Sequence, residues 1–369
     1  MFTDLITGGI INLIELGWIS DRLTRAGIRR LCRNRLAQVS SDDQAKQQQQ
    51  FERFLQEASQ APIAPLAEKA NEQHYEIPAA FYDLVLGTRK KYSCCFYDDS
   101  DDLDQAETDA LRVTCQRAEL CDGQDVLELG CGWGSLTLWM AEHYPNSKIT
   151  AVSNSASQRK HILEQAKMRG IAENLSLLTV DMNDFEIDQK FDRVVSVEMF
   201  EHMRNHRALL KKVASWLRAE GKLFVHIFCH REFTYPFETE GSSNWMGRYF
   251  FTGGIMPAES LFSHYNDDMQ ITQQWRWNGK HYERTSNHWL ENLDRNHDQV
   301  LAVLENVYGR QAKRWLNRWR VFFMACAELF AAVEGQQWYV AHYLFQKAEV
   351  LAEHEKRNRQ LQPTIELEP

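Results

Sequence analysis

Two glutamates and a histidine, Glu198, Glu201 and His202, form the cluster in this sequence that is best suited to general-base chemistry. Their spacing of i, i+3 and i+4 would place all three side chains on one face of a helical turn. Two carboxylates beside an imidazole can attract a cation and accept its proton. The alternative is a charged cluster on a helix surface, where Glu and His are common.

A glycine-rich turn is the second chemical feature. Gly130, Gly132 and Gly134 follow an apolar run that ends in Glu128. Such a turn lets a ligand approach the backbone closely, and the N-terminus of the following helix supplies N–H donors. The spacing is G-x-G-x-G rather than the G-x-G-x-x-G of dinucleotide folds, and Val152-Ser153-Asn154 lacks the acidic residue that binds an NAD ribose. The pattern favours S-adenosylmethionine (SAM) over NAD, with a merely structural turn as the alternative.

Strands and helices alternate through the middle of the chain, which predicts an α/β fold with a doubly wound parallel sheet. The predicted strands are 125–129, 148–152, 175–180, 193–197 and 222–228, with a closing strand at 338–346. The predicted helices between them are 135–143, 158–169 and 208–217. Right-handed crossovers place ligands at the carboxyl ends of the strands, where the glycine turn and the Glu–His cluster both fall.

The sequence predicts two units, an N-terminal extension and a larger domain. Residues 1–70 form a helical N-terminal extension, and Pro62 and Pro65 interrupt any helix at its end. Residues 71–369 form the catalytic domain. Within that domain, the aromatic, turn-rich stretch 229–265 and the helical stretch 285–334 interrupt the strand–helix pattern, as an inserted substrate cap would.

The charge and the cysteine content limit the partners and the cellular compartment that we expect. The formal net charge of -9 argues against a broad nucleic-acid surface, which needs many cations. The apolar stretch 5–14 is too short to span a bilayer, and the eight cysteines form no CxxC pair, which favours a reduced cytoplasmic protein without a bound metal. The Arg-rich stretch 19–36 is the one segment that we expect could touch an anionic membrane. A solvated helix face is the simpler interpretation, and a homodimer stays open.

Seven ordered motifs extend the argument over nearly the whole chain. They are His74-Tyr75-Glu76-Ile77-Pro78, Lys91-Tyr92-Ser93-Cys94-Cys95, residues 126–134, residues 196–203, residues 224–230, residues 249–254 and residues 278–282. On these motifs the chain resembles the cyclopropane-fatty-acyl-phospholipid synthase superfamily, and within it the coclaurine N-methyltransferase branch. The resemblance implies a class I SAM-dependent methyltransferase with a Rossmann-like, doubly wound, seven-stranded sheet.

The resemblance also assigns residues to SAM. They are Tyr92 and Ser93 at its methionine end, Gly130 and Gly132 along its carboxypropyl and ribose region, Asn154 and Gln158 on the ribose hydroxyls, and Asp181 and Met182 around the adenine. The position of Asp181 after a strand agrees with this role, because its carboxylate can accept from an exocyclic amine. A helix N-cap is the alternative role for Asp181.

For the acceptor, the resemblance implies an aromatic pocket. Its predicted lining residues are Tyr75, Phe251, Trp319 and Phe322. Such walls suit a planar or cationic amine, and they would equally suit an acyl chain. We assign His202 and Glu198 as base and substrate anchor, with Glu201 in support.

One substitution separates the enzyme hypotheses. The resemblance implies that the cyclopropane synthases usually carry glycine where this chain has Glu198, which favours N-methylation of a small hydrophobic or aromatic amine. The alternative is an enzyme that modifies unsaturated lipid acyl chains. Cys94, Glu201, His226 and Tyr282 match positions that hold a bicarbonate in the synthases, so bicarbonate belongs to that alternative. A SAM-binding regulator without turnover is the third hypothesis, and the intact Glu–His cluster argues against it.

Overall fold

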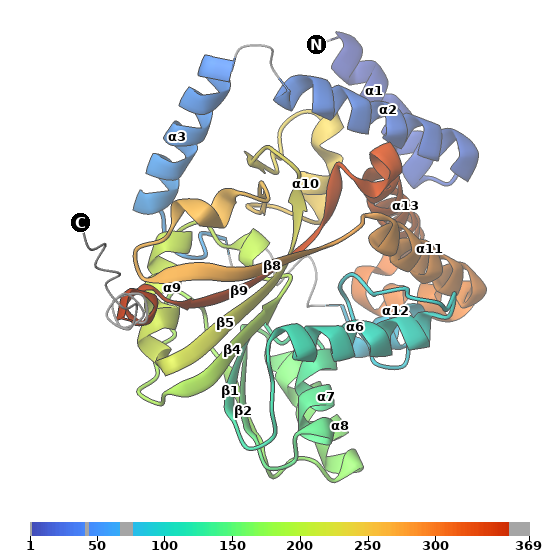
Figure 1. Cartoon of the computed structure of the whole chain (residues 1–369). Helices are drawn as coiled ribbons and strands as arrows, with labels where there is room; N and C mark the ends of the chain where they lie inside the picture. Colours follow the sequence, from blue (N-terminus) through green and yellow to red (C-terminus); the bar gives the residue numbers. More distant parts are fainter. Residues whose placement is uncertain (1, 41–43, 67–76, 354–369) are drawn as a thin grey trace.

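The computed structural model describes residues 2–40, 44–66 and 77–353 of the chain (Figure 1). Its centre is a seven-stranded sheet in the order β3-β2-β1-β4-β5-β9-β8. The strands are β1 (Asp125–Leu129), β2 (Lys148–Ser153), β3 (Leu175–Thr179), β4 (Phe191–Val197), β5 (Leu217–His230), β8 (Met269–Trp277) and β9 (Trp338–Lys347). The first five strands are parallel, and β9 runs antiparallel to both β5 and β8. The predicted doubly wound α/β fold is confirmed.

Alternate side chains of the central strands point to opposite faces of the sheet, as the period of a strand requires. Leu127 and Val194 pack into the cluster that contains helix α9 (His206–Trp216). Val126 and Val195 pack into the cluster that contains α6 (Leu103–Arg117) and α7 (Ser135–His143). Because both faces are covered, these strands read as continuous apolar runs, which is why the sequence predicts them.

Strand β8 was not predicted from the sequence pattern. It is an edge strand, and most of its central residues are exposed or only half-buried. Its segment Gln270-Ile271-Thr272-Gln273-Gln274 is mostly polar and carries no apolar run. Strand β9, which lies between β5 and β8, is buried along almost its whole length and was predicted.

Further helices pack on the sheet or gather at one end of the molecule (Figure 1). They include α5 (Ala79–Val85), α8 (Ala156–Arg169), α10 (Trp245–Tyr249), α11 (Lys280–Arg295), α12 (His297–Tyr308) and α13 (Ala312–Gly335), with a short strand pair β6 (Tyr235–Pro236) and β7 (Ile255–Met256). The N-terminal part forms α1 (Phe2–Glu15), α2 (Asp21–Val39) and α3 (Gln44–Gln60). Helices α1 and α2 lie against α13, and α3 lies against α9. Within the described residues, no helix is long and apolar enough to cross a membrane.

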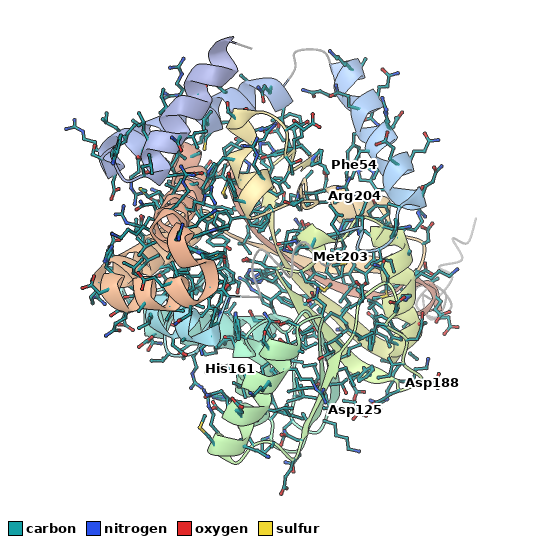
Figure 2. The ribbon with its side chains drawn as sticks, turned by 180° about the vertical axis from the view of Figure 1, so that it is seen from behind. Phe54, Asp125, His161, Asp188, Met203 and Arg204 are labelled. Carbon is teal, nitrogen blue, oxygen red and sulfur yellow. The ribbon has the colours of Figure 1, made fainter. Side chains whose placement is uncertain are left out.

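The segment that follows α3 packs against the sheet. The amide of Arg204 donates to Ile63 O at 2.7 Å, and Asn183 exchanges two hydrogen bonds with Ala64. The Arg204 guanidinium also lies over the ring of Phe54, and both residues are seen near Met203 in Figure 2. The proline-containing stretch therefore holds the N-terminal helices to the sheet and brings Ala64 to its ligand edge.

Candidate active site

The glycine turn joins β1 to α7. Gly130 has a φ of +75°, and a Cβ placed there would lie 2.8 Å from Cγ of Met199. Gly132 has a φ of +51°, and a Cβ there would meet nothing within 4 Å. Residues that carry a Cβ rarely adopt such positive φ angles, so glycine is favoured at both positions. At Gly132 the backbone is open to a ligand.

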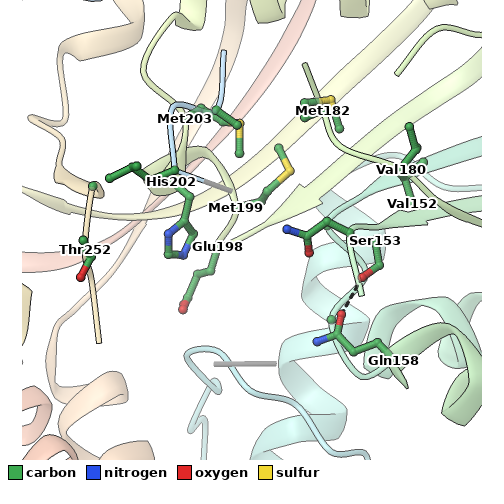
Figure 3. Close-up of a pocket in the computed structure, with 16 residues that line it drawn as sticks. Val152, Ser153, Gln158, Val180, Met182, Glu198, Met199, His202, Met203 and Thr252 are labelled. Carbon is green, nitrogen blue, oxygen red and sulfur yellow. Dashed lines mark hydrogen bonds between the residues drawn. The ribbon is translucent and has the colours of Figure 1, made fainter. Parts of the chain in front are cut away.

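A pocket lies beyond this turn, at the carboxyl ends of β1, β2 and β4 (Figure 3). Strands β2 and β4 lie on opposite sides of β1, so the chain leaves β1 toward one edge of the sheet and later returns to build toward the other edge. Open α/β sheets bind ligands at such a point. The lining residues are Ala64, Leu66, Gly130, Gly132, Val152, Ser153, Asn154, Gln158, Val180, Met182, Glu198, Met199, His202, Met203, Thr252 and Gly253. The fold thus brings seven predicted site residues to one pocket.

Gln158 carries a buried donor that needs a partner. Its side chain is 1% exposed, and the hydroxyl of Ser153 donates to its Oε1 at 2.6 Å (Figure 3). Among the residues that the structure describes, its Nε2 has no hydrogen-bond partner. A buried donor left without an acceptor is costly, so a ligand oxygen fits this position. The contact of Gln158 with the SAM ribose stays a prediction.

Other residues predicted to contact SAM do not line this pocket. Asp181 accepts a hydrogen bond from the amide of Asn183 at 2.7 Å and so closes the turn after β3, while its neighbours Val180 and Met182 line the pocket. Ser93 accepts from Nζ of Lys91 at 2.5 Å. The half-buried ring of Tyr92 packs against Tyr82 and Trp289 at the edge of the core. The roles of these residues toward SAM stay predictions.

Glu198 departs from the helical geometry expected for the cluster. Only Phe200–His202 forms a turn of 3-10 helix, and Glu198 precedes it with a φ of +47°. The expectation that all three side chains share one helical face was therefore wrong. The amide of Glu198 donates to the carbonyl of His226 at 2.9 Å, which extends the pairing of β4 with β5 by one residue and fixes this backbone.

Three donors converge on the Glu198 carboxylate. Its Oε1 accepts from the amide of Cys94 at 2.9 Å and from Nε2 of His226 at 3.1 Å. Its Oε2 accepts from the hydroxyl of Tyr282 at 2.7 Å. Burial raises the pKa of Glu198, and the opposing effects of Lys91 and of the hydrogen bonds from Cys94 and Tyr282 offset this only in part. The arrangement suits a carboxylate held in one orientation at the edge of the pocket.

Glu201 and His202 occupy different environments. Glu201 is fully buried, its Oε1 accepts from the amide of Phe228 at 3.0 Å, and its Oε2 has no partner within the described part of the chain. Burial and the charge of Glu198 raise the pKa of Glu201 well above its usual value, which favours the protonated acid. Burial lowers the pKa of His202 to about 4, so its imidazole is neutral at neutral pH. Glu201 thus favours the neutral acid and His202 the neutral base, and both lie beside the Glu198 carboxyl group.

The predicted acceptor pocket is only partly described. The ring of Phe251 stacks on His202 with centroids 6.0 Å apart, and it lies 6.1 Å from Phe322. Trp319 is fully buried between Phe81 and Phe250, which is a core position. Tyr75 lies outside the described residues. The substrate roles of all four residues remain predictions.

Sequence reasoning missed several residues of the site. Met199 and Met203 line the pocket on either side of His202, and Ala64 and Leu66 reach it from the N-terminal part of the chain. The position of the methionines beside the Glu–His cluster was the only available signal for them. Phe330, whose ring stacks on Tyr282 at 4.3 Å, belonged to a predicted helix without a site role.

Comparisons with known proteins agree with this geometry. The family model for mycolic acid cyclopropane synthetase matches residues 65–339. The (S)-coclaurine N-methyltransferase of Thalictrum flavum subsp. glaucum is 35% identical over 344 residues, which are 92% of this chain and 95% of that protein. The cyclopropane-fatty-acyl-phospholipid synthase of Escherichia coli (strain K12) is 27% identical over 271 residues, which are 73% of this chain and 66% of the synthase.

A solved structure of coclaurine N-methyltransferase, bound to N-methylheliamine and SAH, matches the fold with a TM-score of 0.88. It is 34% identical in sequence, and the match covers 92% of this chain and 99% of that one. The fold, the pocket and these matches define a SAM-dependent methyltransferase. The chain belongs to the mycolic acid cyclopropane synthetase family, which confirms the resemblance found in its sequence.

Proposed function

We propose that this chain transfers the methyl group of SAM to the nitrogen of a small hydrophobic or aromatic amine. One observation carries the proposal, namely that a carboxylate with three hydrogen-bond donors, Glu198, lines the pocket together with neutral His202 (Figure 3). The N-methyltransferases among its relatives support the same choice.

The chemistry of the acceptor explains why both groups are needed. An alkylamine is protonated at neutral pH and then lacks a lone pair, and deprotonation costs about 1.4 kcal/mol for each unit by which its pKa exceeds the pH. The Glu198 carboxylate attracts the ammonium, and either this carboxylate or the His202 imidazole accepts its proton. Bound SAM supplies an electrophilic methyl carbon on a sulfonium, which the freed nitrogen attacks in line as the carbon–sulfur bond breaks. Correct placement of the nitrogen accounts for much of the rate gain.

Aromatic side chains give the site its preference for a hydrophobic acceptor. Phe251 packs edge-to-face on Phe228 at 5.7 Å and lies beside His202. Ring faces attract the ammonium of the substrate or of a methylated product, and their apolar surface binds the rest of the molecule. We assign Phe251 and Phe322 to this wall, together with Trp319 and Tyr75 from the resemblance.

The Glu198 contacts also argue against the lipid-modifying alternative. Cys94, His226 and Tyr282 match positions that hold bicarbonate in the synthases, and here all three donate to Glu198. Because this carboxylate already occupies those donors, we propose that the chain needs no separate bicarbonate. Activity should be unchanged in buffer freed of carbon dioxide, and a requirement for added bicarbonate would overturn this point.

A product-resolved screen tests the proposed function. SAM consumption is measured with aromatic amines, thiols and unsaturated phospholipid vesicles, and each product is identified by mass spectrometry. We expect N-methylated aromatic amines as the main products. Cyclopropanated or methylated acyl chains as the main products would show that the lipid alternative is correct.

We further propose that the α1–α2 hairpin contacts an anionic phospholipid surface. Exposed apolar side chains gather there, with Trp18 75% and Leu23 64% exposed beside the turn between the helices. Arg25 and Arg29 pair with Glu328, while Arg22, Arg30 and Arg33 are exposed. An open apolar cavity of about 810 Å³ lies behind the hairpin, between α1, α2, α10 and α13. Exposed apolar groups beside arginines fit the interface of an anionic bilayer.

Vesicle sedimentation tests this contact. We expect binding to vesicles that contain phosphatidylserine, weaker binding to neutral vesicles, and loss of binding in a Trp18→Ser/Leu23→Ser variant. A Met168→Ser variant is the matched control, because Met168 is 72% exposed on α8. A homodimer that uses the same hairpin is the alternative. Light scattering that shows a dimer broken by the double variant would overturn the membrane proposal.

The remaining assignments are proposals as well. We propose a helical extension at residues 1–70 and a methyltransferase domain at 71–369. A reducing, cytoplasmic compartment is supported by the eight cysteines, all of which are free thiols in the structure. The net charge of -9 is our reason to propose no nucleic-acid partner.

A further inference from the structure

A chain of hydrogen bonds runs from Arg117, near the protein surface, to the Glu198 carboxylate. Nη1 of Arg117 lies 2.8 Å from Nδ1 of His342. Nε2 of His342 lies 2.9 Å from Nδ1 of His226, and Nε2 of His226 lies 3.1 Å from Oε1 of Glu198. Arg117 and His342 therefore reach the pocket through His226, although neither lines it.

The direction of donation along this chain of hydrogen bonds follows from the chemistry of Arg117. A guanidinium can only donate, so Nδ1 of His342 accepts, and the proton of a neutral His342 sits on Nε2. That proton is donated to Nδ1 of His226, which leaves the His226 proton on Nε2, pointing at Glu198. Burial lowers the pKa of both histidines well below the usual value, so each carries a single proton. One tautomer of each ring is compatible with the whole chain.

The sheet holds the chain in place. His226 on β5 and His342 on β9 are paired residues of neighbouring strands, and both are fully buried. Trp277 of β8 packs on both rings, 4.4 Å from His342 and 5.3 Å from His226. Arg117 ends α6 and lies over Trp275 and Trp277. The geometry is thus built into three strands and a helix.

We propose that Arg117 and His342 are positioning residues, which act through His226 to keep the Glu198 carboxylate ionised and aimed at the acceptor's ammonium. The positive charge of Arg117 polarises both imidazoles toward Glu198, which strengthens the last hydrogen bond. This inference rests on the proposed function for its effect on catalysis.

Other charged and titratable groups also surround this chain of hydrogen bonds. Glu198 is faced by Lys91, Cys94, Glu201, His202, Tyr282 and Cys326. The two histidines are faced by Lys91 and Arg117. Variants of Arg117 leave all of the first group in place, so they isolate the contribution of the chain from that of Glu198's direct neighbours.

The first experiment compares Arg117→Met with wild type across pH. We expect kcat/KM for the amine to fall about tenfold at pH 6.5 and to recover at higher pH, because Glu198 ionises less readily without the guanidinium. The ratio of variant to wild type removes the amine's own titration. SAH affinity should change less than twofold. Arg112→Met, an exposed arginine on the same helix, is the matched control. A loss that is equal at every pH, or no loss, would overturn the proposal.

The second experiment needs no substrate. ¹⁵N NMR of histidine-labelled protein should show His226 and His342 as single Nε2–H tautomers in the wild type, and mixed tautomers in Arg117→Met. His342→Gln can still accept from Arg117 and donate toward His226, so it should retain more activity than His342→Leu. Unchanged tautomers in Arg117→Met would overturn the inference. If the tautomers shift but no amine is methylated, the proposed function fails and the hydrogen-bond chain stands.

Discussion

The hydroxyl of Tyr282 donates to Oε2 of Glu198 at 2.7 Å, and this contact links helix α11 to the end of strand β4. The tyrosine ring is held from its other side by Phe330, on which it stacks. The orientation of the Glu198 carboxylate therefore depends on a residue that lies 84 positions away in the sequence.

Removing this hydroxyl should weaken the site without unfolding it. We expect Tyr282→Phe to lower kcat/KM by about tenfold or more, since a hydrogen bond to a charged group contributes roughly 1.5–3 kcal/mol. The phenylalanine ring keeps the packing against Phe330, so the melting temperature should change little. Steady-state kinetics and a thermal melt check both statements. Tyr308→Phe, at a stacked tyrosine on α12, is the control, and equal effects of the two variants would refute the role of Tyr282.

Gln158 should act on SAM alone. Gln158→Ala removes the unpartnered buried Nε2, so we expect SAM and SAH to bind about tenfold more weakly while KM for the amine is unchanged at saturating SAM. Isothermal titration with SAH measures the first quantity. Gln165→Ala, on the outer part of the same helix, should bind SAH normally. A Gln158 variant with full SAH affinity would show that this donor does not meet the ligand.

Stability should depend on pH through His206, a buried histidine behind the site. Its Nε2 lies 2.9 Å from Phe200 O, and burial lowers its pKa to about 4. Between the unfolded value near 6.5 and pH 4, the unfolded state binds the proton more tightly, so His206 makes the protein less stable as the pH falls through this window.

The variant His206→Gln removes this titration. Relative to wild type, it should gain stability on going from pH 7.5 to pH 5, by up to about 2 kcal/mol. Urea unfolding at the two pH values measures the difference. A stability difference that is the same at both values would contradict the assigned pKa shift.

The central strands and the cluster at the end of β4 could be predicted because their signals are local. Strand β8 could not, because an edge strand needs no apolar run on its exposed side. The sequence spacing suggested a shared helical face for Glu198 and His202, but the pairing of Glu198 with His226 O gives Glu198 a left-handed backbone instead. That pairing is a tertiary contact, so the spacing of these residues in the sequence does not reveal it.

Arg117 and His342 show the same limit more strongly. They lie 225 positions apart, and their contact exists only because β9 pairs with β5 in one register while α6 ends beside both strands. The resemblance marked His226 and Tyr282 as site residues. It did not indicate that a carboxylate of this chain would accept their hydrogen bonds, which is a property of the folded site.

We propose above all that Glu198 binds and orients a protonated amine for methylation. The most direct measurement is single-turnover methyl transfer to an aromatic amine by Glu198→Gln, with SAH affinity measured on the same sample and exposed Glu232→Gln as control. We predict a loss of roughly a hundredfold or more in the transfer rate, since an ionic partner of the reacting group is removed, with SAH affinity nearly unchanged. Transfer at the wild-type rate by Glu198→Gln would show that the Glu198 charge is not needed to bind and orient the amine.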